Sequence, residues 1–180
     1  MPLPICTIDA SIVVGLDHLN LLPQLSLLFS RVLLPKAVRT ELYRRRETKD
    51  RLQAILRAYA FIERCDDYDK GAVDVLLVDR VRQGFEDRGE AEAVIQAAKV
   101  GATVIVDDPW GRGLAKRVGR EFHGTIWVMR RFYELGLVTG PVARSSFLRL
   151  LDRGIRLPVA SINEFLVEIG ESPIPLMHQA

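Results

Sequence analysis

The chain has 180 residues, of which 48% are hydrophobic and 27% are charged, and its formal net charge is +2. This length and composition favour one compact domain with a hydrophobic core. The weak net charge excludes a strong field over the whole molecule, so binding to nucleic acid would depend on local clusters of Lys and Arg.

Neither the cysteines nor the N-terminal residues indicate an exported or membrane-bound protein. Cys6 and Cys65 have no metal-binding spacing and suggest no disulfide framework, which suits a reducing compartment. The first residues lack a basic region followed by a long apolar run, and no apolar stretch reaches the roughly 18 residues of a membrane span. We therefore expect a soluble, cytoplasmic protein without a membrane segment.

Short apolar runs and helical spacing predict an alternation of strands and helices. The predicted strands are 5–8, 32–34 and 103–106. The predicted helices are one that follows Asp9, then 21–29, 36–46 and 89–100, and four near 111–118, 125–135, 143–152 and 161–169. Helical spacing also appears at 52–59 and 73–81, with a loop at 66–71 between them. This alternation predicts an α/β fold with helices on both faces of a parallel sheet. Residues 1–171 are expected to form one domain and 172–180 a flexible tail.

Acidic residues follow two of the predicted strands. Asp9 ends the first, and Asp107 and Asp108 follow the third. Ligands of open α/β sheets bind at the carboxyl ends of the strands, so these acids are candidate ligands. The alternative is that Asp9 and Asp108 only cap the helices that follow them.

The predicted helix 89–100 carries two glutamates at different positions around its axis. Its helical period places four apolar residues on the core face: Ala91, Val94, Ile95 and Ala98. Glu90 lies at the edge of this face and should point partly inward, which is costly unless a positive group meets it. That group would be the helix dipole, an arginine or a metal ion. Glu92 falls with Gln96 and Lys99, on the side expected to face solvent.

A further acid, Glu41, lies beside the apolar side of the helix after Pro35, where it is also an i,i+4 partner for Arg45. Carboxylates without His or Cys partners form a site that suits Mg²⁺ or Mn²⁺ rather than zinc. The three histidines make poor ligands because His18 and His123 are isolated and His178 lies in the tail. Such a site suits phosphoryl transfer to water.

Four motifs occur in order along the chain, and together they resemble the PIN-like domain family. They are Asp9-Ala10-Ser11, Val38-x-x-Glu41, Gly89-Glu90-Ala91-Glu92-Ala93-Val94, and Val106-Asp107-Asp108 followed by Arg112 and Ala115. The closest resemblance is to the branch of this family that has the Gly-Glu-Ala-Glu-Ala helix followed by the Asp-Asp motif. Segment 119–136 and Gly170-Glu171 also resemble that branch, so the resemblance covers nearly the whole chain. One departure is Trp127, where this branch commonly has a small residue.

The resemblance implies a three-layer α/β/α fold with a small central parallel sheet. It also implies a metal-dependent ribonuclease, often the toxin of a toxin–antitoxin pair. By position, the catalytic acids would be Asp9, Glu41, Glu90 and Asp108, and the metal ligands would come from Asp9, Glu90, Asp107, Asp108 and Glu92. Expected partners are single-stranded or structured RNA, a small antitoxin protein and a second copy of the chain.

Basic residues follow Asp108 at helical spacing. On one continuous helix, Arg112, Lys116 and Arg120 would form a stripe that could contact an RNA backbone, or they could form an ordinary solvated face. A second basic cluster lies at 44–51. Two other functions stay open: a catalytically weak binding module with the same fold, and a receiver-like phospho-switch, which would need a strand-end lysine that we do not find.

Overall fold

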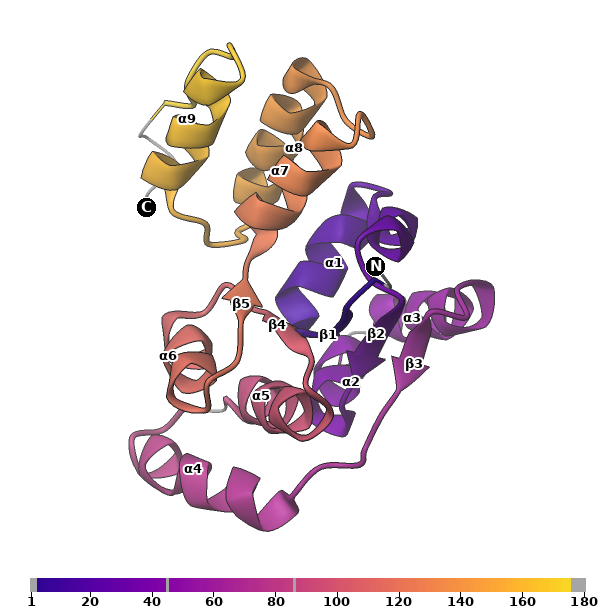
Figure 1. Cartoon of the computed structure of the whole chain (residues 1–180), viewed down its shortest axis with the longest axis vertical. Coiled ribbons are helices and arrows are strands. Elements are labelled where there is room, and N and C mark those ends of the chain that lie inside the picture. The colour runs from indigo at the N-terminus through magenta and orange to yellow at the C-terminus, as the bar shows by residue number, and fades with distance from the viewer. Residues whose placement is uncertain (1–2, 45, 86, 176–180) are drawn as a thin grey trace.

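The computed structural model describes residues 3–44, 46–85 and 87–175. Its centre is a sheet of five parallel strands in the order β3-β2-β1-β4-β5 (Figure 1). The strands are β1 (Ile5–Ile8), β2 (Arg31–Leu34), β3 (Ile62–Arg64), β4 (Thr103–Ile105) and β5 (Phe122–His123). Thr7 of β1 lies opposite Leu33 of β2 and Val104 of β4. Because all strands run the same way, their carboxyl ends share one edge of the sheet.

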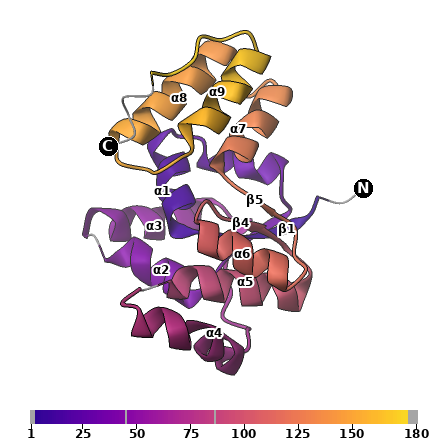
Figure 2. The same ribbon diagram turned by 90° about the vertical axis from the view of Figure 1, so that its left-hand side faces the viewer.

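Helices cover both faces of this sheet, which confirms the predicted α/β/α fold. They are α1 (Ala10–His18), the 3-10 helix η1 (Leu22–Leu27), α2 (Lys36–Tyr43), α3 (Arg46–Ala58), α4 (Lys70–Arg82), α5 (Arg88–Val100), α6 (Pro109–Arg117), α7 (Thr125–Glu134), α8 (Gly140–Asp152) and α9 (Val159–Glu168). Helices α4, α5 and α6 lie on one side, and α1, α7, α8 and α9 lie on the other (Figures 1 and 2).

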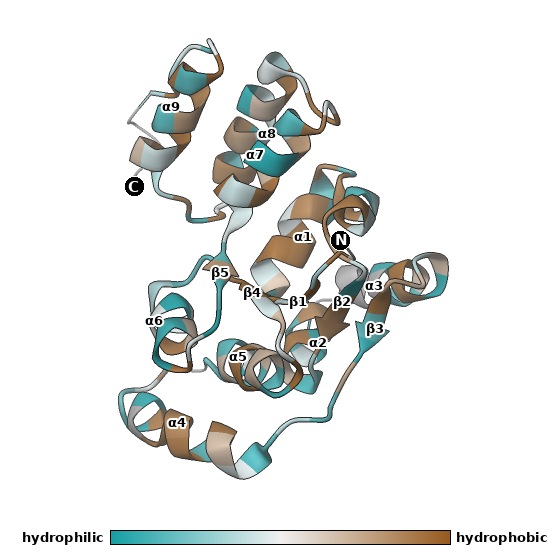
Figure 3. Cartoon of the chain, in the orientation of Figure 1, coloured by the Kyte–Doolittle hydropathy of each residue, from teal (hydrophilic) through white to brown (hydrophobic). Residues whose placement is uncertain are grey.

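Strand alternation divides the hydrophobic core between the two faces. Cys6 and Ile8 of β1 pack with α1 and the α7–α9 layer, whereas Val104 of β4 and Val106 just after it pack with α4, α5 and α6. Helix α1 is apolar along much of its length, as Figure 3 shows, because it is enclosed between the sheet and the α7–α9 layer. A slip of one residue in any strand would exchange the two sets of side chains, so this pattern also fixes the register.

Helix boundaries follow local signals in the sequence. Asp9 caps α1, Pro109 occupies the first turn of α6, and Gly101 ends α5 in the left-handed conformation with φ of 71°. Segment 21–29, predicted as a helix, contains the shorter η1, and the helix expected through residue 46 ends at Tyr43. The two outer strands, β3 and β5, were not predicted.

Residues 172–175, which were expected in a flexible tail, contact α8 and α9. Ile174 is only 2% exposed, its amide donates to Oδ1 of Asn163 at 2.7 Å, and its carbonyl accepts from Nδ2 of Asn163 at 3.0 Å. Arg144 donates to the carbonyl of Ser172 at 2.8 Å. Residues 172–175 therefore pack on α8 and α9, and 176–180 lie outside the described residues. Among the described residues, no helix is long and apolar enough to cross a membrane.

Candidate active site

Asp9 lies where β1 meets α1 and is almost completely buried. Its side chain is 5% exposed, and its Oδ2 accepts hydrogen bonds from the amide and hydroxyl of Ser11. Burial raises the pKa of Asp9, its hydrogen bonds lower it, and the nearby charge of Asp107 raises it again. The capping role is therefore real. It is compatible with a second role, because the acid is held at the carboxyl edge beside other carboxylates.

Glu90, in the first turn of α5, is the most strongly perturbed of these acids. Burial raises its pKa most, the charges of Asp9, Glu41 and Asp87 raise it further, and together they bring it to about 8. These carboxylates from β1, α2 and α5 therefore interact, and we call Asp9, Glu41 and Glu90 the Glu90 group. Their mutual repulsion would fall if a cation were bound among them.

Two glycines allow the Glu90 group to gather. A Cβ atom at position 89 would lie 2.7 Å from Oε1 of Glu41, so any larger residue there would require the Glu41 carboxylate to move. A Cβ atom at position 111 would lie 2.7 Å from Cγ2 of Val106 and 3.3 Å from Cγ of Glu90. The predicted motif residues Gly89 and Gly111 thus provide the space that the acidic side chains occupy.

Asp107 is bound on several sides by other residues. Its Oδ2 accepts from the Thr125 hydroxyl at 2.6 Å, and its Oδ1 accepts from the Thr125 amide at 3.0 Å. Arg112 forms an ion pair with Oδ1 at 3.3 Å and also donates through Nε to the carbonyl of Val106. Asp107 therefore joins the end of β4 to the starts of α6 and α7, although its charge still reaches Asp9.

Asp108 caps α6. Its Oδ1 accepts from the amides of Trp110 at 2.8 Å and Gly111 at 3.2 Å. This is the capping alternative that the sequence left open, and Asp108 is not among the charges that shift Asp9 or Glu90. The structure thus brings Asp9, Glu41 and Glu90 into one electrostatic group and leaves Asp108 beside it.

The expectation that Glu92 faces solvent is wrong. Glu92 is 3% exposed and accepts from the amide of Ala37, in the first turn of α2, at 2.7 Å. It also pairs with Arg88 at 3.3 Å, and a hydrogen bond from Tyr68 to Glu92 adds to the burial that raises the pKa of Tyr68. Gln96 is also buried, whereas Ala98, expected in the core, is exposed. The cause is that α5 packs against α2, α4, α6 and the sheet, so it lacks a single apolar face.

The predicted basic stripe does not form on one helix. Helix α6 ends at Arg117, and Gly119 has φ of 66°, so Arg120 leaves the helical path. Arg112 is held by Val106 and Asp107, which leaves Lys116 as the exposed member without an ion pair among the described residues. Of the second basic cluster, residue 45 and the side chains of 46–49 lie outside the described residues, and Arg51 pairs with Asp17.

Among the described residues, no three acidic, His or Cys side chains are close enough to hold one metal ion between them. A Mg²⁺ site commonly needs only one or two carboxylates, because water and substrate phosphate supply the other ligands. The buried and mutually repelling carboxylates of Asp9 and Glu90 fit that requirement. Sequence reasoning missed Asp87, which precedes α5 and pairs with Arg80; its position before the Gly89-Glu90 motif was the available signal.

Two aromatic residues near the end of β5 pack together. The ring of Trp127 stacks on His123 with centroids 3.9 Å apart and lies 6.4 Å from the ring of Phe29. His123 also contacts Glu121. The unusual tryptophan therefore packs against the end of β5 and against Phe29, and His123 is engaged there.

Comparison with known proteins identifies one family over nearly the whole chain. The family model that matches residues 5–171 is described as a PIN domain. A search of the curated proteins finds no match.

Proposed function

Because the chain belongs to the PIN-domain family, a nuclease-type fold, we propose that it is an endoribonuclease that depends on Mg²⁺ or Mn²⁺. The observation that carries the proposal is the Glu90 group, in which carboxylates from three elements lie near one another at the carboxyl edge of the sheet, and burial together with these charges raises the pKa of Glu90 to about 8. Clustered carboxylates without His or Cys ligands suit a hard divalent cation.

In this proposal, Asp9 and Glu90 hold the ion, Glu41 is the third acid, and Asp108 is the fourth because it follows β4 beside β1 at the same sheet edge. A bound divalent ion would supply Lewis acidity toward the phosphate and lower the pKa of an attacking water. Glu90 must lose its proton to become a ligand. Asp107 orients Arg112 and the start of α7, and Glu92 fixes α2 relative to α5, so both support the site indirectly.

The finer parts of the proposal are supported by the resemblance to a family whose members are often the toxin of a toxin–antitoxin pair. They are that the substrate is single-stranded or structured RNA, that the protein is the toxin of a pair neutralised by a small antitoxin, that it forms a homodimer, and that it acts in the cytoplasm. Lys116 of α6 is proposed as a phosphate contact, whereas Arg112 and Arg120 would contribute only if their present contacts were exchanged.

A second candidate is a binding module that turns over slowly. The observation in its favour is that Asp107, Asp108 and Glu92 already have hydrogen-bond partners, and that no three acids among the described residues are placed to hold one ion. Such a protein would bind RNA or protein on the same surface without cleaving RNA at a useful rate.

Cleavage of a fluorescent single-stranded RNA in Mn²⁺ separates the two candidates. We expect cleavage by the wild type and a loss of at least about 100-fold in Asp9→Asn and Glu90→Gln. Glu164→Gln, which changes an exposed acid on α9, should cleave normally. Calorimetry should show weaker Mn²⁺ binding by Asp9→Asn than by the wild type. Equal Mn²⁺ affinity and equal cleavage in wild type and Asp9→Asn would reject the assigned site.

A further inference from the structure

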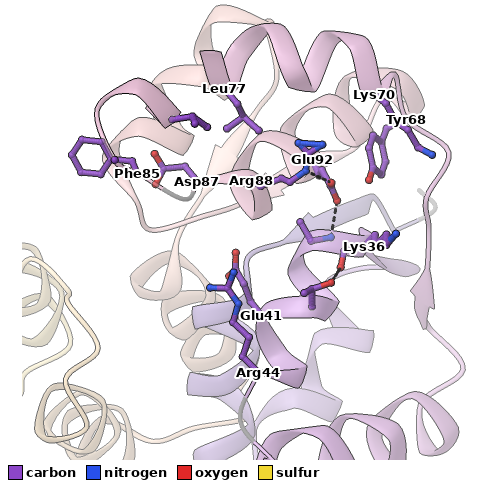
Figure 4. A pocket seen from close by; sticks show the side chains of 14 residues that line it. Lys36, Glu41, Arg44, Tyr68, Lys70, Leu77, Phe85, Asp87, Arg88 and Glu92 are labelled. Atoms are coloured by element: carbon purple, nitrogen blue, oxygen red, sulfur yellow. Dashed lines mark hydrogen bonds and ion pairs between the residues drawn. The ribbon is translucent and has the colours of Figure 1, made fainter. Parts of the chain in front are cut away.

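A cavity of about 660 Å³ lies between α2, α4 and the start of α5, next to the Glu90 group. Its size is in the range of pockets that hold small ligands. Helix α2 contributes Lys36, Thr40, Glu41 and Arg44, and α4 contributes Lys70, Leu77 and Val81. In Figure 4, Lys36, Tyr68 and Lys70 lie at one end, and Glu41 and Arg44 lie at the other.

The two walls of this cavity differ in chemistry. The α2 wall is polar and largely cationic, whereas Leu77 and Val81 of α4, with Phe85 just after it, make the facing wall apolar. Val81 and Phe85 are 64% and 47% exposed, so their apolar surface is accessible to a ligand, although the Arg80 guanidinium lies over the Phe85 ring at 4.0 Å from its centroid. A ligand that fits both walls carries negative charge on one side and flat apolar surface on the other.

Four basic side chains line the cavity against three acidic ones, and the charge of Lys36 also acts on Asp66. The acids Glu92 and Asp87 are paired with Arg88 and Arg80. By contrast, neither Lys36 nor Lys70 forms an ion pair among the described residues. Two exposed ammonium groups at one end of a cavity attract an anion, and phosphate is the anion that the proposed substrate carries.

The spacing along α2 connects this end to the acids. Helix α2 rises about 1.5 Å per residue, so the five residues from Glu41 back to Lys36 span about 7.5 Å. A stacked strand rises about 3.4 Å along its axis per nucleotide. If its axis runs along α2, this distance therefore corresponds to about two nucleotides. A strand whose scissile phosphate lies at the Glu90 group would therefore place a second phosphate near Lys36 and Lys70.

We propose that this cavity is a subsite for single-stranded RNA, in which Lys36 and Lys70 hold the phosphate about two nucleotides from the scissile one. The bases pack against Leu77, Val81 and Phe85, as single strands do on apolar and aromatic surfaces. This subsite rests on the proposed ribonuclease function. It adds a stretch of the RNA path on the α2–α4 side of the acids to the phosphate contact proposed for Lys116 of α6.

The test compares the double variant Lys36→Gln/Lys70→Gln with Arg57→Gln/Arg156→Gln, which removes the same charge from exposed positions elsewhere. Binding of fluorescent single-stranded oligonucleotides is measured by anisotropy in EDTA over a range of salt concentrations. We expect the first variant to bind about tenfold more weakly. We also expect its slope of log affinity against log salt to flatten by about 0.7, the value for one phosphate. The control should match the wild type in both. Cross-linking of 4-thiouridine RNA to the wild type should map to segments containing Tyr68 or Phe85.

Each other outcome has a defined meaning. If the wild type cleaves RNA but the Lys36/Lys70 variant keeps its affinity and salt slope, or if cross-links map to α6 alone, the subsite is wrong and the nuclease stands. An equal loss in both double variants would show a bulk-charge effect and would also reject the subsite. If the wild type neither binds nor cleaves RNA, the proposed function fails and the subsite fails with it.

Discussion

The Glu90 group and the Asp107–Asp108 pair lie at the same edge of the sheet and carry the same chemistry, yet their surroundings differ. Asp107 and Asp108 accept hydrogen bonds from Thr125, Trp110 and Gly111 and an ion pair from Arg112. Glu90 is instead surrounded by the charges of Asp9, Glu41 and Asp87, and its pKa rises to about 8. Asp107 and Asp108 are therefore surrounded by donors, whereas burial and neighbouring negative charges disfavour the charged form of Glu90.

This difference teaches that position at a strand end does not by itself make an acid a ligand. An acid that caps a helix or holds an arginine stabilises the fold, so its removal should cost free energy of unfolding. An acid buried beside like charges destabilises the folded protein until a cation binds. Substitutions in the two regions should therefore change stability in opposite directions, which gives four tests.

The largest effect is expected for Asp107→Ala. The change leaves Arg112 and both donors of Thr125 without their partner in a region where the Asp107 side chain is only 11% exposed. We expect a loss of about 3 kcal/mol of unfolding free energy in urea. Asp67→Ala is the control, because Asp67 is 76% exposed and pairs only with Lys99, and it should cost less than about 0.5 kcal/mol. A similar loss of unfolding free energy in Asp107→Ala and Asp67→Ala would show that the partners of Asp107 do not stabilise the fold.

Two glycines of α6 provide the next test. Gly111→Ala places a methyl group against Val106 and Glu90 and should cost about 1–2 kcal/mol despite the better helix propensity of alanine. Gly113→Ala, two residues later in the same helix, meets nothing within 4 Å and should stabilise by about 0.5–1 kcal/mol. Denaturant midpoints that move in the same direction would show that the close approach to Glu90 is unimportant.

Glu92→Gln tests the glutamate that the helical period wrongly predicted to face solvent. The amide oxygen can still accept from Ala37, but the ion pair with Arg88 and the negative charge at the start of α2 are lost. We expect a destabilisation of about 1–1.5 kcal/mol. No change in thermal or urea unfolding would mean that Glu92 does not hold α2 against α5.

Glu90→Gln is the acid substitution that we expect to stabilise the folded protein, by an amount that depends on pH. The folded protein keeps the Glu90 proton up to about pH 8, whereas the unfolded chain releases it near the ordinary value of 4.5. Unfolding therefore releases a proton between these values, and wild-type stability falls as pH rises through that window. The variant lacks this decline, so it should match the wild type at pH 4 and exceed it by at least about 1 kcal/mol above pH 8. If the stability of the wild type and of Glu90→Gln changed with pH in the same way, Glu90 would not be buried beside repelling carboxylates as assigned.

Much of the fold was predictable because its central strands are apolar runs and its helices have clear signals. Strands β1, β2 and β4 were found, and the predicted helix 89–100 ends where α5 ends. The outer strands β3 and β5 have only three and two residues, too few for a periodic pattern, and they exist because an inner strand offers pairing groups. The strand propensity of so few residues cannot predict a strand that forms because it pairs with a neighbour distant in sequence.

The candidate site was predictable as a set of acids but not in its internal division. Sequence placed Asp9 and Glu90 correctly, since a strand end and a first helical turn fix where they lie. Sequence could not show that Asp107 binds Thr125 and Arg112 whereas Asp108 caps α6. The reason is that the Asp107 partners lie in elements that follow it in the chain. Sequence also misplaced Glu92, because a helix with neighbours on several sides has no single polar face.

The hydrogen bonds between Asn163 and Ile174 affect how fast amide protons exchange in this segment and where the chain can be fused or truncated. Ile174 lies six residues before the last residue, yet its amide is bonded to a side chain of α9 and its own side chain is buried. Deuterium should therefore replace this amide proton only when the α8–α9 layer opens, rather than by fraying of the terminus. Fusions attached after residue 175 should leave this layer closed, whereas a truncation before Ile174 should expose α8 and α9 to rapid exchange and proteolysis.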